Sequence, residues 1–220
     1  MADRKRLPVS EAVVRRLPAY YRHLREMEVM GERRTSSREL SKRMGLTASQ
    51  IRQDLNCFGG FGQQGYGYHV DELKKRIGEI LGLTRSYHTI IIGAGNIGRA
   101  VANYPPFRRE GFEIRALFDE SPAIIGAAVQ GLIVQPADSL EAWIAAHEAD
   151  IAVLAVPAES ARAMFARLMQ SGVRAVWNFT PVDLDAPPEV VVQNVHLSDS
   201  LYTLTYRMRE NERGGIVGGQ

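Results

Sequence analysis

The chain has 220 residues, of which 45% are hydrophobic and 24% charged, and its net charge is +2. This balance is typical of a globular protein with room for two domains. No apolar stretch reaches the ~18–20 residues of a membrane helix, and the charged first residues lack the apolar core of a secretory signal. Cys57 is the only cysteine, which excludes an intrachain disulfide, so we expect a cytoplasmic protein.

Charge is unevenly distributed along the sequence. Residues 1–85 carry 17 Lys and Arg against 10 Asp and Glu, whereas residues 86–220 carry 10 against 15. The two parts therefore have net charges of +7 and −5. This favours an N-terminal domain that meets a polyanion such as DNA, although a solvated basic face would give the same counts.

The N-terminal part predicts a long helix followed by two short ones. Pro18 lies inside the long helical pattern and should interrupt or kink it. Ser36–Glu39 and Thr47–Gln50 have the spacing of capping boxes, each of which begins a helix, and Gly45 lies in the turn between them. Two short helices around such a turn are typical of a helix-turn-helix. The inward residues expected in the long helix are Val13, Val14, Leu17, Tyr21, Leu24 and Met27.

The second short helix is the candidate DNA reader. Ile51 and Leu55 should anchor it to the core, so that polar residues around them face outward, where Arg can bind guanine and Gln adenine. Glycines and aromatic residues alternate over 59–70, as in the hairpin wing of a winged helix, and a helix capped by Asp71 follows over 72–81. A small helical domain that packs on a protein partner is the alternative. The candidate DNA-binding residues are Thr47, Ser49, Gln50, Arg52, Gln53, Gln63, Gln64 and Tyr66.

An uncharged, Ile-rich run over residues 89–92 leads into Gly93-x-Gly95-x-x-Gly98. The run suits a strand buried on both faces. The glycines would permit a tight turn, close approach of a pyrophosphate to the backbone, and close packing of a helix whose N–H groups face the phosphates. Asp119 ends the next predicted strand, about where an acid meets the ribose hydroxyls of NAD. A strand-to-helix turn without a ligand is the alternative.

Strands and helices continue to alternate to residue 193. Strands are expected over 112–118, 131–134, 150–156, 174–179 and 190–193, and helices over 139–147 and 158–170. This order predicts an α/β fold with a Rossmann-like, doubly wound parallel sheet, in which ligands bind outside the carboxyl ends of the strands.

Three further segments are expected at those strand ends, over 103–107, 155–157 and 178–181. They are mostly apolar and would suit the neutral ring of NADH better than the cationic ring of NAD, although their aromatic residues could equally be core. The candidate cofactor-binding residues are Gly93, Ala94, Gly95, Asn96, Ile97, Gly98, Tyr104, Asp119, Val156, Pro157, Asn178, Phe179, Thr180 and Pro181.

The sequence does not indicate a catalytic or metal site. A dehydrogenase needs a positioned acid or base and a substrate clamp, and only His196 follows a predicted strand, without an arginine beside it. One cysteine and scattered histidines lack metal-ligand spacing. An NAD-dependent dehydrogenase is therefore less favoured than a regulator. A protein that binds NAD(H) or a CoA-type nucleotide and has weakened DNA binding stays open.

Motifs in both parts resemble the redox-sensing repressor family Rex, from about residue 8 to residue 208. They are Arg16–Arg22, Ser49–Leu55, Phe61–Tyr68, Gly93–Gly98 and Asn178–Pro181. The resemblance implies a winged-helix homodimer that binds palindromic double-stranded operator DNA at genes for anaerobic or fermentative NADH reoxidation. NADH would release it from DNA, and NAD would compete for the same site.

The resemblance also implies a domain order and an exchanged helix. The DNA-binding domain would span 1–84 and the NAD(H)-binding domain 85–198. A dimerisation helix exchanged between subunits would follow over 199–212, centred on 200–209, before a tail over 213–220.

The DNA-binding surface departs from the Rex pattern. Gln53 stands where the family has a lysine, and Gln63–Gln64 stands where it has a basic pair. Each lost phosphate contact weakens DNA binding. It also makes the plot of log binding constant against log salt concentration shallower, by about 0.9 in slope. We expect weaker binding, altered specificity, or both.

A third departure concerns coupling between the two domains. His196 stands where the family has an aspartate that exchanges partners between a tyrosine and an arginine, which Tyr104 and Arg22 match here. A neutral histidine cannot replace the ion pair with the arginine. The resemblance therefore predicts weaker or pH-shifted coupling between NADH and DNA.

Overall fold

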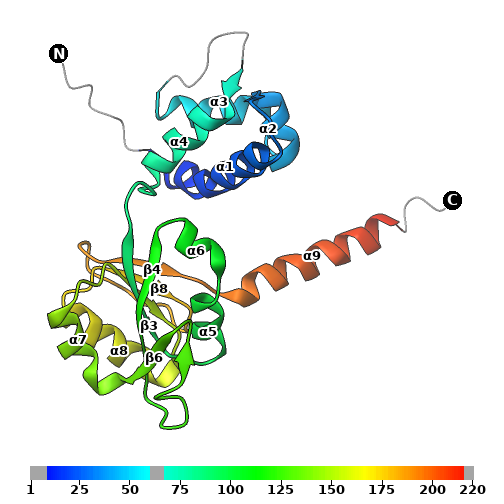
Figure 1. Cartoon of the computed structure of the whole chain (residues 1–220). Helices are drawn as coiled ribbons and strands as arrows, with labels where there is room; N and C mark the ends of the chain where they lie inside the picture. Colours follow the sequence, from blue (N-terminus) through cyan, green and yellow to red (C-terminus); the bar gives the residue numbers. More distant parts are fainter. Residues whose placement is uncertain (1–8, 60–66, 216–220) are drawn as a thin grey trace. The chain divides into compact units, whose positions relative to one another are not determined.

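The computed structural model describes residues 9–59 and 67–215, and it divides into two compact units between Arg85 and Ser86 (Figure 1). This division lies one residue beyond the expected domain boundary. Gln63, Gln64 and Tyr66, three of the candidate DNA-binding residues, lie outside the described residues.

The N-terminal unit contains four helices among its described residues. These are α1 (Glu11–Val29), α2 (Ser37–Met44), α3 (Ala48–Asn56) and α4 (Val70–Ile80). Two of the three predicted caps are confirmed, because the Ser36 hydroxyl accepts from the Glu39 N–H and the Thr47 hydroxyl from the Gln50 N–H, both at 3.1 Å. The third is wrong, because α4 begins at Val70 and Asp71 lies within its first turn. Gly45 ends α2 in the left-handed conformation, with φ of 67°. The helix-turn-helix is therefore α2 and α3.

Helix α1 continues through Pro18 without interruption. Proline removes only one N–H from the helical ladder, and burial on both sides of it holds the helix together. The inward residue of the Tyr20–Tyr21 pair is Tyr20, which is fully buried, whereas Tyr21 is half-buried and Val14 is exposed. The core that α1 forms with the other three helices contains Leu17, Tyr20, Leu24, Met27, Leu40, Ile51, Leu55, Val70, Leu73 and Ile77.

The expected wing is only partly described, and its strand has an unexpected partner. Strand β2 (Tyr68–His69) pairs antiparallel with β1 (Arg34–Thr35), a strand the sequence did not indicate. Gly67 has a φ of 71°, and a Cβ there would lie 2.3 Å from the Thr35 carbonyl oxygen. Only glycine permits this approach, so the pairing of β2 with β1 requires glycine at position 67.

The C-terminal unit is built on a seven-stranded sheet with the order β5-β6-β4-β3-β7-β8-β9. All neighbouring strands are parallel except β5 and β6. The chain places β4 on one side of β3 and later β7 on the other, which makes the end of β3 a topological switch point. The strands are β3 (Tyr87–Ile92), β4 (Phe112–Asp119), β5 (Ala128–Val129), β6 (Leu132–Pro136), β7 (Ile151–Leu154), β8 (Ala175–Asn178) and β9 (Val191–Asn194).

Helices cover both faces of this sheet (Figure 1). Ile90 and Ile92 pack in the core with α7 (Leu140–Ala146) and α8 (Ala158–Gln170), whereas Ile91 faces the core with α5 (Asn96–Ala102) and α6 (Pro105–Arg109). A short 3-10 turn, Ala137–Ser139, precedes α7. This alternation along β3 confirms the prediction of a doubly wound α/β sheet with a strand buried on both faces.

Helix α9 (Leu197–Gly215) follows β9 and differs from every other helix described. Its side chains from Leu197 to Arg213 are all exposed. They include six large apolar ones, Leu197, Leu201, Tyr202, Leu204, Tyr206 and Met208.

Candidate functional site

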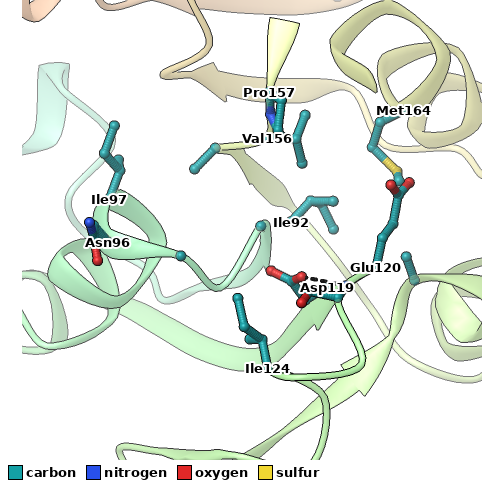
Figure 2. Close-up of a pocket in the computed structure, with 14 residues that line it drawn as sticks. Ile92, Asn96, Ile97, Asp119, Glu120, Ile124, Val156, Pro157 and Met164 are labelled. Carbon is teal, nitrogen blue, oxygen red and sulfur yellow. Dashed lines mark hydrogen bonds between the residues drawn. The ribbon is translucent and has the colours of Figure 1, made fainter. Parts of the chain in front are cut away.

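A cleft of about 460 Å³ opens at the switch point of the sheet (Figure 2). The chain that follows β3 forms one wall, the end of β4 another, and residues after β7 a third. Seven predicted residues line it: Gly93, Gly95, Asn96, Ile97, Asp119, Val156 and Pro157. Ala155, the first residue of the expected segment 155–157, also lines it. Six further lining residues were not predicted: Ile92, Glu120, Ser121, Ile124, Ala137 and Met164.

The three glycines of the motif differ in what an added side chain would meet. Gly93 has a φ of 93°, and a Cβ on it would lie 2.4 Å from the Ala155 carbonyl oxygen. A Cβ on Gly98 would lie 1.9 Å from the Gly93 carbonyl oxygen, so α5 needs glycine to pack against the turn. A Cβ on Gly95 would meet no atom within 4 Å. The missing side chain of Gly95 therefore leaves space in the cleft for a ligand to approach the backbone.

Asp119 connects the end of β4 to the glycine turn. One carboxylate oxygen accepts from the Ala94 N–H at 2.7 Å and the other from the Ser121 N–H at 2.8 Å. Each oxygen keeps a second lone pair that can accept from a ribose hydroxyl. Glu120, an exposed residue at the same edge, adds a second carboxylate to the cleft. Two negative side chains here disfavour a ribose that carries a phosphate.

The predicted segment after β8 does not line the cleft. The Asn178 amide donates to the Val182 carbonyl at 2.8 Å and to the Asn194 side chain at 2.7 Å, and its oxygen accepts from the Thr180 N–H. Asn178 and Thr180 are buried, Phe179 packs against Trp177, and Pro181 is exposed. The polar side chains of this segment fix the chain after β8.

Tyr104 lies away from the cleft. It precedes the short helix α6, and its ring contacts Phe107, which in turn contacts Phe112, the first residue of β4. Helix α5 has already returned the chain to the amino end of the sheet at this point. The prediction that residues 103–107 lie at the carboxyl ends is therefore wrong.

The candidate DNA-reading surface lies on α3. Thr47, Ser49, Arg52 and Gln53 are exposed, as predicted, and Ile51 and Leu55 are buried. Gln50 differs, because it is half-buried and its amide donates to a carboxylate oxygen of Asp54 at 2.8 Å. Asp54 is buried in the same face of α3 and was not predicted as a functional residue.

The three predicted switch residues are divided between the two units. Arg22 is exposed on α1. In the C-terminal unit, Tyr104 is exposed and His196 pairs with Asp183, with 2.8 Å between His196 Nε2 and Asp183 Oδ1. Position 196 therefore has a carboxylate beside it, supplied by a residue that the sequence did not single out.

Two other kinds of site are absent from the residues that the structure describes. They contain no group of three or more His, Cys, Asp or Glu side chains placed to hold a metal ion. Among the same residues, no helix combines the length and apolarity required to cross a membrane.

Two family models match the chain in order. Residues 8–56 match a family described as putative DNA-binding protein N-terminus, and residues 84–182 match a family described as CoA binding domain. A redox-sensing transcriptional repressor Rex of Thermoanaerobacter pseudethanolicus is 50% identical over 208 residues, which are 94% of this chain and 93% of that protein. The chain belongs to the Rex family.

Other Rex relatives and solved structures agree over nearly the whole chain. The Rex protein of Clostridioides difficile is 51% identical over 93% of this chain and 97% of its own length. The Rex-family repressor RSP in complex with NAD⁺ and operator DNA has a TM-score of 0.87 at 49% identity, covering 97% of this chain and 99% of RSP.

RSP in complex with NADH has a TM-score of 0.88 at 46% identity, covering 96% of this chain and 99% of RSP. The Rex family is named for transcriptional repression, which confirms the interpretation of the chain as a regulator rather than an enzyme.

Proposed function

We propose that this chain is a redox-sensing repressor that binds operator DNA as a homodimer and leaves it when NADH occupies the cleft at Gly93–Gly98. NAD⁺ would compete for the same cleft. The observation that carries the proposal is the pairing of an open glycine turn with an exposed reading helix in one Rex-family chain. Repression takes place where the DNA is, so the proposal includes a cytoplasmic location.

The fit of the cleft to a dinucleotide rests on its two ends. The space in front of Gly95 admits a pyrophosphate to the backbone. Asp119 and Glu120 line the other end of the cleft, where their carboxylates would accept hydrogen bonds from free ribose hydroxyls. Val156, Pro157 and Ile97 give the cleft apolar walls, against which the neutral ring of NADH is buried at lower cost than the cationic ring of NAD⁺.

A CoA-type ligand is the second candidate, because residues 84–182 match the CoA binding domain family. The ribose of CoA carries a phosphate, whereas both adenosine ribose hydroxyls of NADH are free. The carboxylates of Asp119 and Glu120 would repel that phosphate. The acidic edge of the cleft therefore favours NADH.

The reading surface fits a major groove. Residues near the N-terminus of α3 would contact base edges, and Thr47, Ser49, Arg52 and Gln53 are exposed there. Gln63, Gln64 and Tyr66 would contact the backbone from the wing. Glutamines at 53, 63 and 64 bring no charge, so we expect a shallower salt dependence than basic residues would give.

A homodimer is supported by α9. Six large apolar side chains on one helix are exposed in a single chain, and burying each removes roughly 1.5–3 kcal/mol of unfavourable hydration. A second copy of the chain, contributing its own α9 in exchange, would cover both helices. Two reading helices would then be held about 34–36 Å apart, one turn of DNA.

NADH would act by binding the two arrangements of the dimer unequally. Moving a population from 1:99 to 99:1 requires about 5.5 kcal/mol of differential binding. Arg22, Tyr104 and His196 are the proposed relay between the cleft and the spacing of the reading helices.

Anisotropy of a fluorescent palindromic A·T-rich duplex tests the proposal. The full-length protein is titrated onto the duplex alone, with NADH, and with NADH plus excess NAD⁺. We expect NADH to weaken binding at least tenfold and NAD⁺ to restore it. Equal affinity under all three conditions, with NADH binding shown separately by calorimetry, would contradict the proposal.

A further inference from the structure

The carboxylate of Asp54 is held by four side-chain hydrogen bonds from two helices. Arg16 on α1 donates from Nε to Oδ2 at 2.7 Å and from Nη2 to Oδ1 at 2.8 Å. The Tyr20 hydroxyl donates to Oδ2 at 3.0 Å, and Gln50 Nε2 donates to Oδ1 at 2.8 Å. A carboxylate has about four acceptor positions, so this set fills them all. We call these residues the Asp54 cluster.

The cluster is built around a buried charge. The side chain of Asp54 is 1% exposed and that of Arg16 is 27% exposed. A buried charge is tolerated only when it is paired and hydrogen-bonded, and the two-pronged contact with Arg16 provides both. Burial alone would raise the pKa of Asp54, but the hydrogen bonds from Arg16, Gln50 and Tyr20 outweigh it and lower that pKa. Asp54 is therefore ionised and can only accept.

An acceptor-only neighbour fixes which way the Gln50 amide faces. The NH₂ group must face Asp54, so the carbonyl oxygen of Gln50 faces away from it. Because the carboxylate repels the Gln50 carbonyl oxygen, Asp54 should accept the Nε2 hydrogen that points away from that oxygen, which leaves the other hydrogen beside it. An acceptor next to a donor is the pattern that matches N6 and N7 of adenine in the major groove.

The position of Gln50 suits this role. It is the third residue of α3 and is half-buried. The exposed Ser49 lies one residue before it and the exposed Arg52 two residues after it. The first turn of a reading helix supplies contacts to base edges. A glutamine side chain that is free to rotate loses conformational entropy when it binds a base. A side chain already held by a hydrogen bond loses less of that entropy.

We propose that Asp54 is a positioning residue for DNA recognition, which presents the Gln50 amide to the major groove in one orientation and so selects adenine at one position of each half-site. The inference rests on the proposed DNA-binding function and adds the residue that sets a base preference.

The test compares base preferences rather than affinities alone. The full-length protein, with NAD⁺ present, selects from a library of randomised duplexes, and the enriched pools are sequenced. For wild type we expect one position per half-site that prefers adenine and loses this preference in Gln50→Ala. In Asp54→Asn that preference should fall about tenfold, because the amide at 54 no longer imposes one orientation on Gln50.

Double-mutant cycles separate positioning from general damage. In the Gln50→Ala background, Asp54→Asn should change the preference at that position by less than about twofold, whereas in the Gln53→Ala background its effect should persist in full. Asp71→Asn, which neutralises an exposed carboxylate in the first turn of α4, is the matched control and should leave the preferences unchanged. A loss of affinity in Asp54→Asn that is equal for all duplexes would overturn the inference.

A measurement on the wild-type protein covers the case in which Asp54→Asn does not fold. The side-chain amide of Gln50 is assigned in a ¹⁵N spectrum by its absence in Gln50→Ala. One of its two protons should be shifted and exchange slowly with water, as a proton bound to a carboxylate does. A pair of protons that match a free glutamine would overturn the inference. If wild type selects no duplex at all, the proposed function fails and the inference fails with it.

Discussion

The two units each contain one central aspartate, and they hold it in opposite ways. Among the described residues, Asp54 in the N-terminal unit accepts from the side chains of Arg16, Tyr20 and Gln50, whereas Asp119 in the C-terminal unit accepts from the backbone N–H groups of Ala94 and Ser121. Side-chain donors depend on residue identity at several positions. Backbone donors depend on the path of the chain, which the glycines determine. The first unit should therefore be sensitive to polar substitutions and the second to added side-chain volume.

The largest effect should come from Asp54→Ala. It leaves the Arg16 guanidinium and the buried Tyr20 hydroxyl without their acceptor, which should cost the N-terminal unit about 3 kcal/mol. Hydrogen exchange on peptides from α1 and α3 measures this local loss. Protection equal to that of wild type would show that the Asp54 cluster does not stabilise the N-terminal unit.

The same variant predicts a change in acid sensitivity. Because the pKa of Asp54 is lowered in the fold, its contribution is complete above the ordinary pKa of aspartate and is lost as pH falls through the lowered value. Protection of α1 and α3 in wild type should therefore decline in acid. In Asp54→Ala that part of the decline should be absent.

Gly98→Ala should give the next largest effect. A Cβ placed 1.9 Å from the Gly93 carbonyl forces α5 away from the turn, at a cost of about 2 kcal/mol to the C-terminal unit. Urea unfolding followed by fluorescence of Trp143 and Trp177, both in this unit, measures the loss.

Gly95→Ala is the matched control for that experiment. Its Cβ would meet no atom within 4 Å, so stability should change by less than about 1 kcal/mol. NADH affinity measured by calorimetry should nevertheless fall about tenfold, because the methyl group occupies the approach to the backbone. Unchanged affinity would mean that the pyrophosphate lies elsewhere.

Asp119→Asn should act on selectivity more than on stability. The single amide oxygen of asparagine still accepts from one of the two backbone N–H groups that Asp119 binds, the other N–H loses its acceptor, and the negative charge is gone. We expect the preference for NADH over NADPH to fall about tenfold, and further when Glu120→Gln is added. Competition binding of the two cofactors measures the ratio. A ratio that stays fixed in both variants would show that the acidic edge does not face the ribose.

The smallest effect should come from position 196. His196→Asp should increase the NADH effect on operator affinity by a few fold, since it supplies at position 196 the negative charge that the proposed relay lacks. Asp183 lies beside this position, so the gain should be larger when Asp183→Asn removes the second carboxylate. Anisotropy titrations with and without NADH measure the ratio, and no change in either variant would exclude position 196 from the relay.

Much of the fold could be predicted because its signals are local. The capping serine and threonine began α2 and α3 at the expected residues, and α8 has the predicted bounds. Strand β1 is two residues long, so it has no periodicity to detect. Tyr20 and Tyr21 are adjacent, and packing against the rest of the core, rather than spacing alone, selected Tyr20 as the buried one.

The candidate site was predictable where a motif described one loop and less so where several segments meet. The glycine turn and Asp119 follow a known spacing, but Ile124, Ala137 and Met164 reach the cleft only through the tertiary fold. Asn178 has the residue type of a ligand-binding side chain, yet its partners are Val182 and Asn194. The sequence shows that an amide side chain can form hydrogen bonds, but its partners are determined by the tertiary fold.

Helix α9 makes the stability of this chain depend on its abundance. A lone 19-residue helix is marginally stable in water, and the side chains described on this one are exposed. If a second copy supplies the covering surface, mass action sets how much of α9 is formed. Dilution would then fray the C-terminus before it affects the sheet, so the cell's supply of this protein would itself tune how many molecules are competent to act.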